Sequence, residues 1–435
     1  MAFIFEHSCL ASKPQLDLFS NLPTQASVED GYHIEHLPRS NPNEGPIKFE
    51  ISGDSNDYMD LLNSYLLLEI KLSKADNTDI DENDVVGPIN LIGQTLFKQI
   101  DVSLNDTLIS DSSNMNHYRS IIESLLSYTS SEAKKQLTMA LHVKDTPGSM
   151  DDIADENKGL VSRRAYLTKS KTLQLIGRPH SDIFYQNRYL INGVDLKLKL
   201  IRNTNALVLM GDAAKAYKLQ IQNASFFVRK VKINSGIQLK HIEKLDKQLQ
   251  PAIYPIRRVM MKSVSIPIGS LSLNEENLFS GQLPKRIIIG LVDSDSFEGL
   301  YTKNPFNFKN FGLKYCSLHM DGKMIPQKPL SSDFENNLSL RNYFTLLEST
   351  GKSFGNNGID IDRTEYEEGY SLLAFDLSPD LEDTGCYHLI RKGNIRLELK
   401  FDKGLTSPVN VIVYSEFDSS IKIDKNRSVL MDYFA

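Results

Sequence analysis

The chain has 435 residues, of which 40% are apolar and 24% charged, a balance typical of a globular protein that is long enough for several domains. Its formal net charge is −6, whereas a protein that wraps nucleic acid electrostatically should be basic, so we expect no sequence-specific nucleic-acid binding. No apolar run of about 18 residues occurs, so we expect no membrane span. Cys9, Cys316 and Cys386 are odd in number and far apart, which argues against a disulfide framework.

The N-terminal segment, residues 1–45, is rich in proline and lacks periodicity. Pro14, Pro23 and Pro38 are among its prolines, and its charges are mostly acidic. This composition predicts an extended arm, and its acidity excludes a basic tail that binds a genome. An arm that serves assembly and a disordered terminus are both open interpretations.

From Ile47 onward, the main signal is the alternation of apolar and polar residues that is typical of strands with one buried face. Such alternation occurs at 47–51, 100–104, 194–200 and 395–401. The dipeptides Asn192-Gly193 and Asp321-Gly322 suit tight hairpin turns. Strands recur through both halves without regular βαβ alternation, so we predict an all-β protein of antiparallel sandwiches with a few helical insertions.

Two regions have helical spacing. One lies near 112–141 and contains a capping box in which Thr129 precedes Glu132 by three residues. The other covers 241–250 and ends before Pro251, in the middle of the chain. We therefore expect a helical insertion in the first half and a connecting helix between the halves.

The two halves share short patterns in the same order. DVSLNDTLI at 101–109 matches SLHMDGKMI at 317–325, and NGVDLKLKL from Asn192 matches KGNIRLELK from Lys392. The shared order indicates a duplicated sandwich, with chance similarity between short strands as the alternative. The predicted boundaries are an arm at 1–45, a first sandwich at 46–240, a connecting helix and linker at 241–256, a second sandwich at 257–430 and a tail at 431–435.

Sequence motifs for chemistry are incomplete. Thr350–Ser353 reads TGKS like the end of a phosphate-binding loop, but Leu346 stands where the loop needs its first glycine. The acidic stretch 79–84 resembles the start of a calcium loop, but Asp84 replaces the required glycine. Cys316 lies in a strand pattern, where a buried inert thiol is expected. We therefore expect no catalytic, cofactor-binding or metal-binding residues and no enzymatic activity.

Basic residues gather in two places. Arg229, Lys230 and Lys232 form the first group, and Arg257, Arg258 and Lys262 form the second. Because the first group alternates with apolar residues, it is interpreted as the polar face of a strand rather than a nucleic-acid site.

Five segments together resemble the major capsid proteins of Polinton or Maverick elements and adintoviruses. They are PINLIGQTLFKQIDVSLND (88–106), IFYQNRYLINGVDLKLKLIRN (183–203), SLNEENLFSGQLPKRIIIGLVDSDSFEG (272–299), YSLLAFDLSPD (370–380) and the stretch 392–430, which begins KGNIRLELKF. The resemblance covers about 47–430 in the expected order.

This resemblance implies a double jelly roll, in which two eight-stranded antiparallel β-sandwiches lie side by side. It also implies homotrimers of pseudo-hexagonal outline that tile an icosahedral shell around a double-stranded DNA genome. The implied partners are neighbouring capsomers, a vertex (penton) protein and minor capsid proteins. The implied location is the virion capsid, with synthesis in the host cytoplasm and assembly in the host nucleus.

Two other functions are compatible with a strand-rich chain. A β-sandwich carbohydrate-binding module or hydrolase would favour tryptophan for stacking on sugars, and the chain contains none. A minor or vertex capsid protein would need only about half of this length for one jelly roll.

Overall fold

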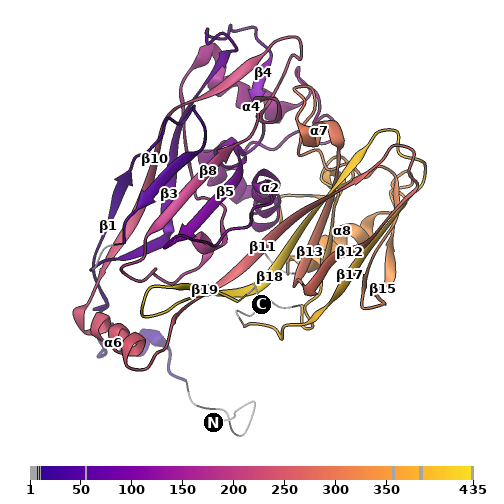
Figure 1. The fold of residues 1–435 in the computed structure, drawn as a ribbon. Helices are drawn as coiled ribbons and strands as arrows, with labels where there is room; N and C mark the ends of the chain where they lie inside the picture. The colour runs from indigo at the N-terminus through magenta and orange to yellow at the C-terminus, as the bar shows by residue number, and fades with distance from the viewer. Residues whose placement is uncertain are drawn as a thin grey trace.

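The computed structural model describes residues 7, 9, 11–53, 56–354, 358–381 and 386–432, and they form two β-sandwiches side by side (Figure 1). The first half of the chain builds one sandwich and the second half builds the other. Among the described residues, no sheet mixes strands from 28–233 with strands from 252–431.

The first sandwich contains two four-stranded antiparallel sheets. One has the order β1 (Val28–His36), β10 (Tyr217–Ile233), β3 (Tyr58–Lys74) and β7 (Leu173–Gly177). The other has the order β2 (Ile47–Ile51), β8 (Leu196–Arg202), β5 (Phe97–Leu104) and β6 (Thr107–Leu108). The sheets pack face to face, and the rings of Phe49 and Phe226 meet between them at 5.8 Å. A short pair, β4 (Val86–Pro88) with β9 (Leu209–Gly211), lies outside these sheets.

The second sandwich repeats this plan. One sheet has the order β11 (Ala252–Ile266), β18 (Val409–Ile423), β13 (Arg286–Asp293) and β16 (Leu372–Asp376), and β19 (Val429–Met431) adds to β18. The facing sheet has the order β12 (Ser272–Gln282), β17 (Lys392–Phe401), β14 (Leu313–Met320) and β15 (Lys323–Ser331). Matched in chain order, the eight main strands of each half therefore occupy the same places.

The predicted duplication is visible at matching hairpins. The turn Asn105–Asp106 joins β5 to β6, and Asp321–Gly322 joins β14 to β15, with positive φ at all four residues. The backbone N–H of Asp195 donates to Asn105 Oδ1 at 2.8 Å, and that of Asn394 donates to Asp321 Oδ1 at 2.9 Å. The Asp321–Gly322 prediction is thus confirmed. The Asn192-Gly193 dipeptide is a turn but not a hairpin, because the preceding bridge joins Leu190 to Met59 instead of to β8.

Helices connect the strands. They are α1 (Ile92–Thr95), α2 (Asn116–Ser127), α3 (Ser130–Ala133), α4 (Lys158–Leu167), α5 (Asn205–Val208), α6 (Ser235–Asp246), α7 (Ser294–Glu298), α8 (Leu340–Ser349) and α9 (Arg363–Glu367). Single 3₁₀ turns occur at Pro14–Leu16, Leu137–Ala140, Thr168–Ser170 and Asp182–Tyr185. The predicted insertion near 112–141 corresponds to α2, α3 and the turn after them, and the Thr129–Glu132 capping box is present at α3. No helix among the described residues is long and apolar enough to cross a membrane.

Four predicted boundaries differ from the structure. The arm at 1–45 includes β1, whose residues are mostly exposed because it is an edge strand, so its alternation is weak. The connecting helix begins at Ser235 rather than 241, because the Asn234 side chain caps it by accepting from Gly236 N. The linker to 256 overlaps β11, whose edge position tolerates Pro255 because one side of an edge strand has no ladder partner. The tail from 431 overlaps the last residue of β19.

The sheet that contains β13 and β18 is buried on both faces. Ile287, Val411 and similar residues face the core of the second sandwich, whereas Ile288 and Ile412 belong to the same apolar cluster as the first sandwich. The first core therefore continues across the junction, and the two halves do not have fully separate cores. This double burial explains the unbroken apolar runs of these strands, which lack one solvated face.

Candidate functional site: the junction between the sandwiches

The TGKS segment has a structural role. Leu346 is fully buried within α8, so the chain cannot curl there as a phosphate loop does. Lys352 Nζ donates hydrogen bonds of 3.0 Å to the carbonyls of Leu126 and Ser127. These carbonyls belong to the last turn of α2, where a cation complements the helix dipole. The lysine of the motif thus caps a helix of the other half of the chain.

The acidic stretch 79–84 is neutralised by lysines. Asp84 is buried and accepts from Lys215 Nζ at 2.7 Å, and Asp79 pairs with Lys71 at 2.8 Å. Burial tends to raise the pKa of Asp84, but the lysine contacts outweigh burial and lower it. Within the described ranges, no group of three or more His, Cys, Asp or Glu side chains could hold a metal ion.

The cysteine and the first basic group lie in strands, as their patterns predicted, and the second basic group lies in β11. Cys316 is fully buried, and burial raises the pKa of its thiol. Arg229 pairs with Asp60 at 3.3 Å, and Lys262 Nζ donates to the carbonyl of Leu278. These contacts direct the cationic groups of Arg229 and Lys262 toward the protein itself.

Helix α2 lies between the sandwiches (Figure 1), and ten of its twelve residues are buried. The ring of Tyr118 stacks on Phe297 at 5.9 Å and meets the edge of Phe306 at 5.8 Å, both from the second half. Helix α2 of the predicted insertion is therefore an interior element and not a surface decoration. The apolar stripe of α2 is wide enough for both sandwiches to pack against it, so the helix lies buried between them.

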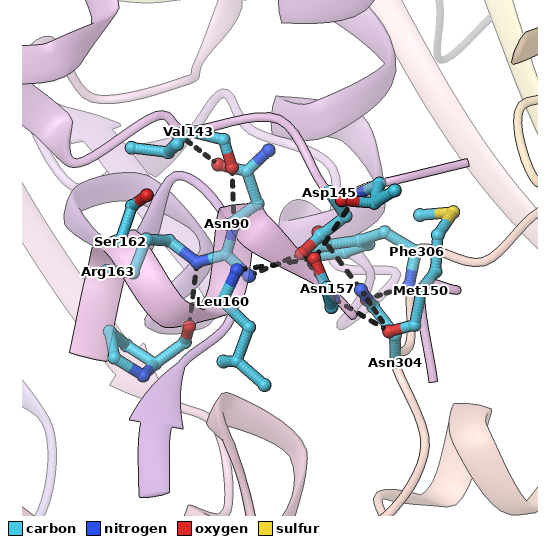
Figure 2. A network of polar contacts seen from close by, with 12 residues as sticks. Asn90, Val143, Asp145, Met150, Asn157, Leu160, Ser162, Arg163, Asn304 and Phe306 are labelled. Carbon is cyan, nitrogen blue, oxygen red and sulfur yellow. Dashed lines mark hydrogen bonds and ion pairs between the residues drawn. The ribbon is translucent and has the colours of Figure 1, made fainter. Parts of the chain in front are cut away.

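A buried polar network lies beside α4 (Figure 2). The side chain of Arg163 is fully buried, and its Nε donates to the carbonyl of Pro88 at 2.9 Å. Its guanidinium also donates to the carbonyl of Val143 and, at 2.7 Å, to Asp145 Oδ1. A buried charge is tolerated only when it is paired and hydrogen-bonded, and here both conditions are met.

Asp145 extends this network into the second half of the chain. Its Oδ1 accepts from Asn157 Nδ2 at 2.9 Å, and its Oδ2 accepts from Asn304 Nδ2 at 3.0 Å (Figure 2). Its carbonyl accepts from the Tyr370 hydroxyl at 3.0 Å. Asn304 and Tyr370 belong to the second sandwich, so one carboxylate and its backbone join segments about 160 to 225 residues apart.

A second charged cluster spans the junction. Arg119 donates to Glu123 at 2.9 Å and to Asp182 at 2.6 Å, and His180 contacts Glu123 at 2.7 Å. Burial favours the neutral form of Glu123, but Arg119 and the His180 hydrogen bond hold its pKa at about 2. From the second half, the Tyr414 hydroxyl oxygen lies 3.3 Å from Glu123 Oε1.

This cluster borders a cavity of about 740 Å³ lined by residues of both halves, including Arg119, Glu123 and Glu416. Glu123 is already paired with Arg119 and His180, and Glu416 accepts from the Tyr414 hydroxyl at 2.8 Å. The arrangement holds charged groups of the two halves together. The cluster therefore forms a polar contact between the two sandwiches.

Sequence reasoning missed these junction residues. Asp145, Arg163 and Asn304 lie in segments with no motif, and their partners are far away in the chain. The one available signal was the pair of apolar runs at 287–292 and 411–414, because such runs indicate strands covered on both faces.

Comparisons with known proteins agree with this architecture. No protein-family model matches the chain. An uncharacterised protein of Caenorhabditis elegans is 26% identical over 432 residues, which cover 94% of this chain and 99% of that protein.

Solved structures match both sandwiches together. A chain in the structure of the Sputnik virophage matches with a TM-score of 0.67 and 13% identity, over 99% of this chain and 94% of that one. A chain of the PBCV-1 virus capsid matches with a TM-score of 0.56 and 11% identity, over 95% and 99%. The mavirus major capsid protein matches with a TM-score of 0.55 and 10% identity, over 98% and 95%. The chain therefore has the double jelly-roll fold that these structures share.

Proposed function

We propose that this protein is a major capsid protein that forms the shell of a double-stranded DNA virus or virus-like transposon. One observation carries the proposal: two sandwiches of identical strand order fill the chain, and capsid structures match it over nearly their full length. Its Polinton, Maverick or adintovirus affinity rests on the five resembling segments. The role is structural rather than enzymatic.

The subunit assembles as a homotrimer in this proposal. Each chain supplies two jelly rolls, so three chains place six around a threefold axis and give a pseudo-hexagonal outline. Closed symmetry is the rule for soluble homo-oligomers. Trimers then tile an icosahedral shell next to a vertex (penton) protein and minor capsid proteins, with synthesis in the host cytoplasm and assembly in the host nucleus.

The junction between the sandwiches suits a shell subunit. A shell subunit must keep its shape under mechanical load. One of its sheets is buried on both faces, and buried ion pairs lie at the junction. Both features resist movement of one sandwich against the other. We place the division between the jelly rolls at α6, with residues 28–233 in the first and 252–431 in the second.

Light scattering on the purified protein tests this assembly. A trimer has a mass of about 148 kDa, three times the 49.2 kDa of the chain. A monodisperse species of 49.2 kDa at micromolar concentration would overturn the proposal.

A further inference from the structure

The N-terminal arm exposes an unusual concentration of apolar side chains. Within Pro14–Leu22, which reads PQLDLFSNL, Phe19 is 97% exposed and Leu22 is 92% exposed. Leu16 and Leu18 are 70% and 75% exposed. Single exposed apolar residues are normal on a protein surface. Four within seven positions form a contiguous apolar surface, which is typical of a site that binds a partner.

A cavity of about 680 Å³ opens where the arm leaves the first sandwich, beside α6. It lies between the start of β1, the end of β10, α6 and the start of β11. Its apolar wall is formed by Val28, Ile191, Ile233, Ile237, Leu245 and Ile253.

The charges of the arm and the cavity are complementary. Pro14–Leu22 carries a single charged side chain, the carboxylate of Asp17. The described residues that line the cavity include Arg188 and Lys244 but no aspartate or glutamate. An apolar segment with one negative charge thus matches an apolar cavity with positive groups.

The arm does not fill the cavity of its own chain. Gln25 fixes its exit, because its side chain accepts from Val28 N at 2.9 Å and donates to the carbonyl of Val28 at 3.1 Å. Pro23 restricts the backbone just before this turn. Residues 11–27 can extend to roughly 55 Å, which is enough to reach a neighbouring subunit.

We infer that Pro14–Leu22 of one subunit docks into this cavity of a second copy, with its leucine and phenylalanine side chains on the apolar wall and Asp17 beside Lys244. The inference rests on the proposed self-assembly. It names the contact that ties one subunit to the next and accounts for the exposure of both surfaces in the single chain.

Disulfide trapping tests the contact directly. In a background with Cys9→Ser and Cys386→Ser, the exposed cysteines are removed, and Phe19→Cys is combined with Ile237→Cys on α6. Mild oxidation should produce covalent dimers and trimers on a non-reducing gel. A matched control pairs Phe19→Cys with Lys323→Cys, which is exposed beside the hairpin turn of the second sandwich, and should stay monomeric on the gel.

The same samples are measured by light scattering before oxidation. Trimers with a disulfide inside one chain would overturn the arm exchange and leave the proposed function standing. Trimers without a disulfide would do the same if the peptide assay described next also shows no binding. Monomers in light scattering would overturn both.

A peptide-binding assay tests the same contact without requiring the two cysteines to meet at disulfide geometry. A labelled peptide of residues 12–26 should bind the full chain carrying Leu18→Ser, Phe19→Ser and Leu22→Ser. An Asp17→Lys peptide should bind about tenfold more weakly, because its new charge faces Arg188 and Lys244. Equal binding of the two peptides, or no binding of either, would contradict the inference.

Discussion

Replacement of Arg163 by methionine should strongly destabilise the protein. The side chain is fully buried, and the substitution leaves the Asp145 carboxylate, also buried, without its cationic partner. The carbonyls of Pro88 and Val143 lose their guanidinium donors as well. Breaking a buried ion pair costs about 3–5 kcal/mol. The amides of Asn157 and Asn304 still donate to Asp145, so we expect the lower part of this range.

Urea unfolding at one fixed protein concentration measures the effect, since the stability of an oligomer depends on concentration. The matched control is Arg39→Met, because Arg39 pairs with Glu50 at 2.8 Å but is 68% exposed. Exposed pairs contribute about 0–1 kcal/mol, so this variant should resemble the natural protein. An Arg163→Met loss below about 1 kcal/mol would refute the reasoning that the network holds the junction together.

Four further outcomes follow from the structure. Asn304→Ala removes one interdomain hydrogen bond to Asp145 and should cost about 1–3 kcal/mol by urea unfolding, and an unchanged midpoint would contradict this. Burial lowers the pKa of His117 to about 3 and of His142 to about 4, so the unfolded chain binds protons at a higher pH than the folded chain does. The free energy of unfolding should therefore fall as pH drops below about 6.5. His117→Phe should flatten this pH dependence, and an unchanged slope would show that His117 does not contribute. Lys352→Met should lower the melting temperature because α2 loses its cap. ATP with magnesium should leave the melting temperature of the natural protein unchanged, and a saturable rise in that temperature would mean that TGKS binds nucleotide. Duplex DNA should bind more weakly than micromolar at physiological salt, because each chain carries a net charge of −6, and tight, steeply salt-dependent binding would reveal a basic face.

Local patterns predicted the strands well where one face of the sheet is solvated. The alternation at 47–51 and 395–401 lies within β2 and β17, because side chains there alternate between core and solvent. The Asp321-Gly322 turn and the Thr129–Glu132 capping box were also readable, since both depend on residues a few positions apart.

The remaining features depend on contacts that a single sequence does not encode locally. Strand β1 is mostly exposed at a sheet edge, so its alternation is too weak to identify it. Helix α2 looks like a surface insertion until Phe297 and Phe306 of the other half cover it. The polar junction requires Asp145 to meet Asn304, which lies 159 residues further along the chain.

Images of the purified protein by negative-stain electron microscopy test the central claim most directly. If three double jelly rolls form one capsomer, class averages should show threefold particles with a pseudo-hexagonal outline made of six lobes. Particles with two lobes, the size of a single chain, at the same micromolar concentration would contradict the account.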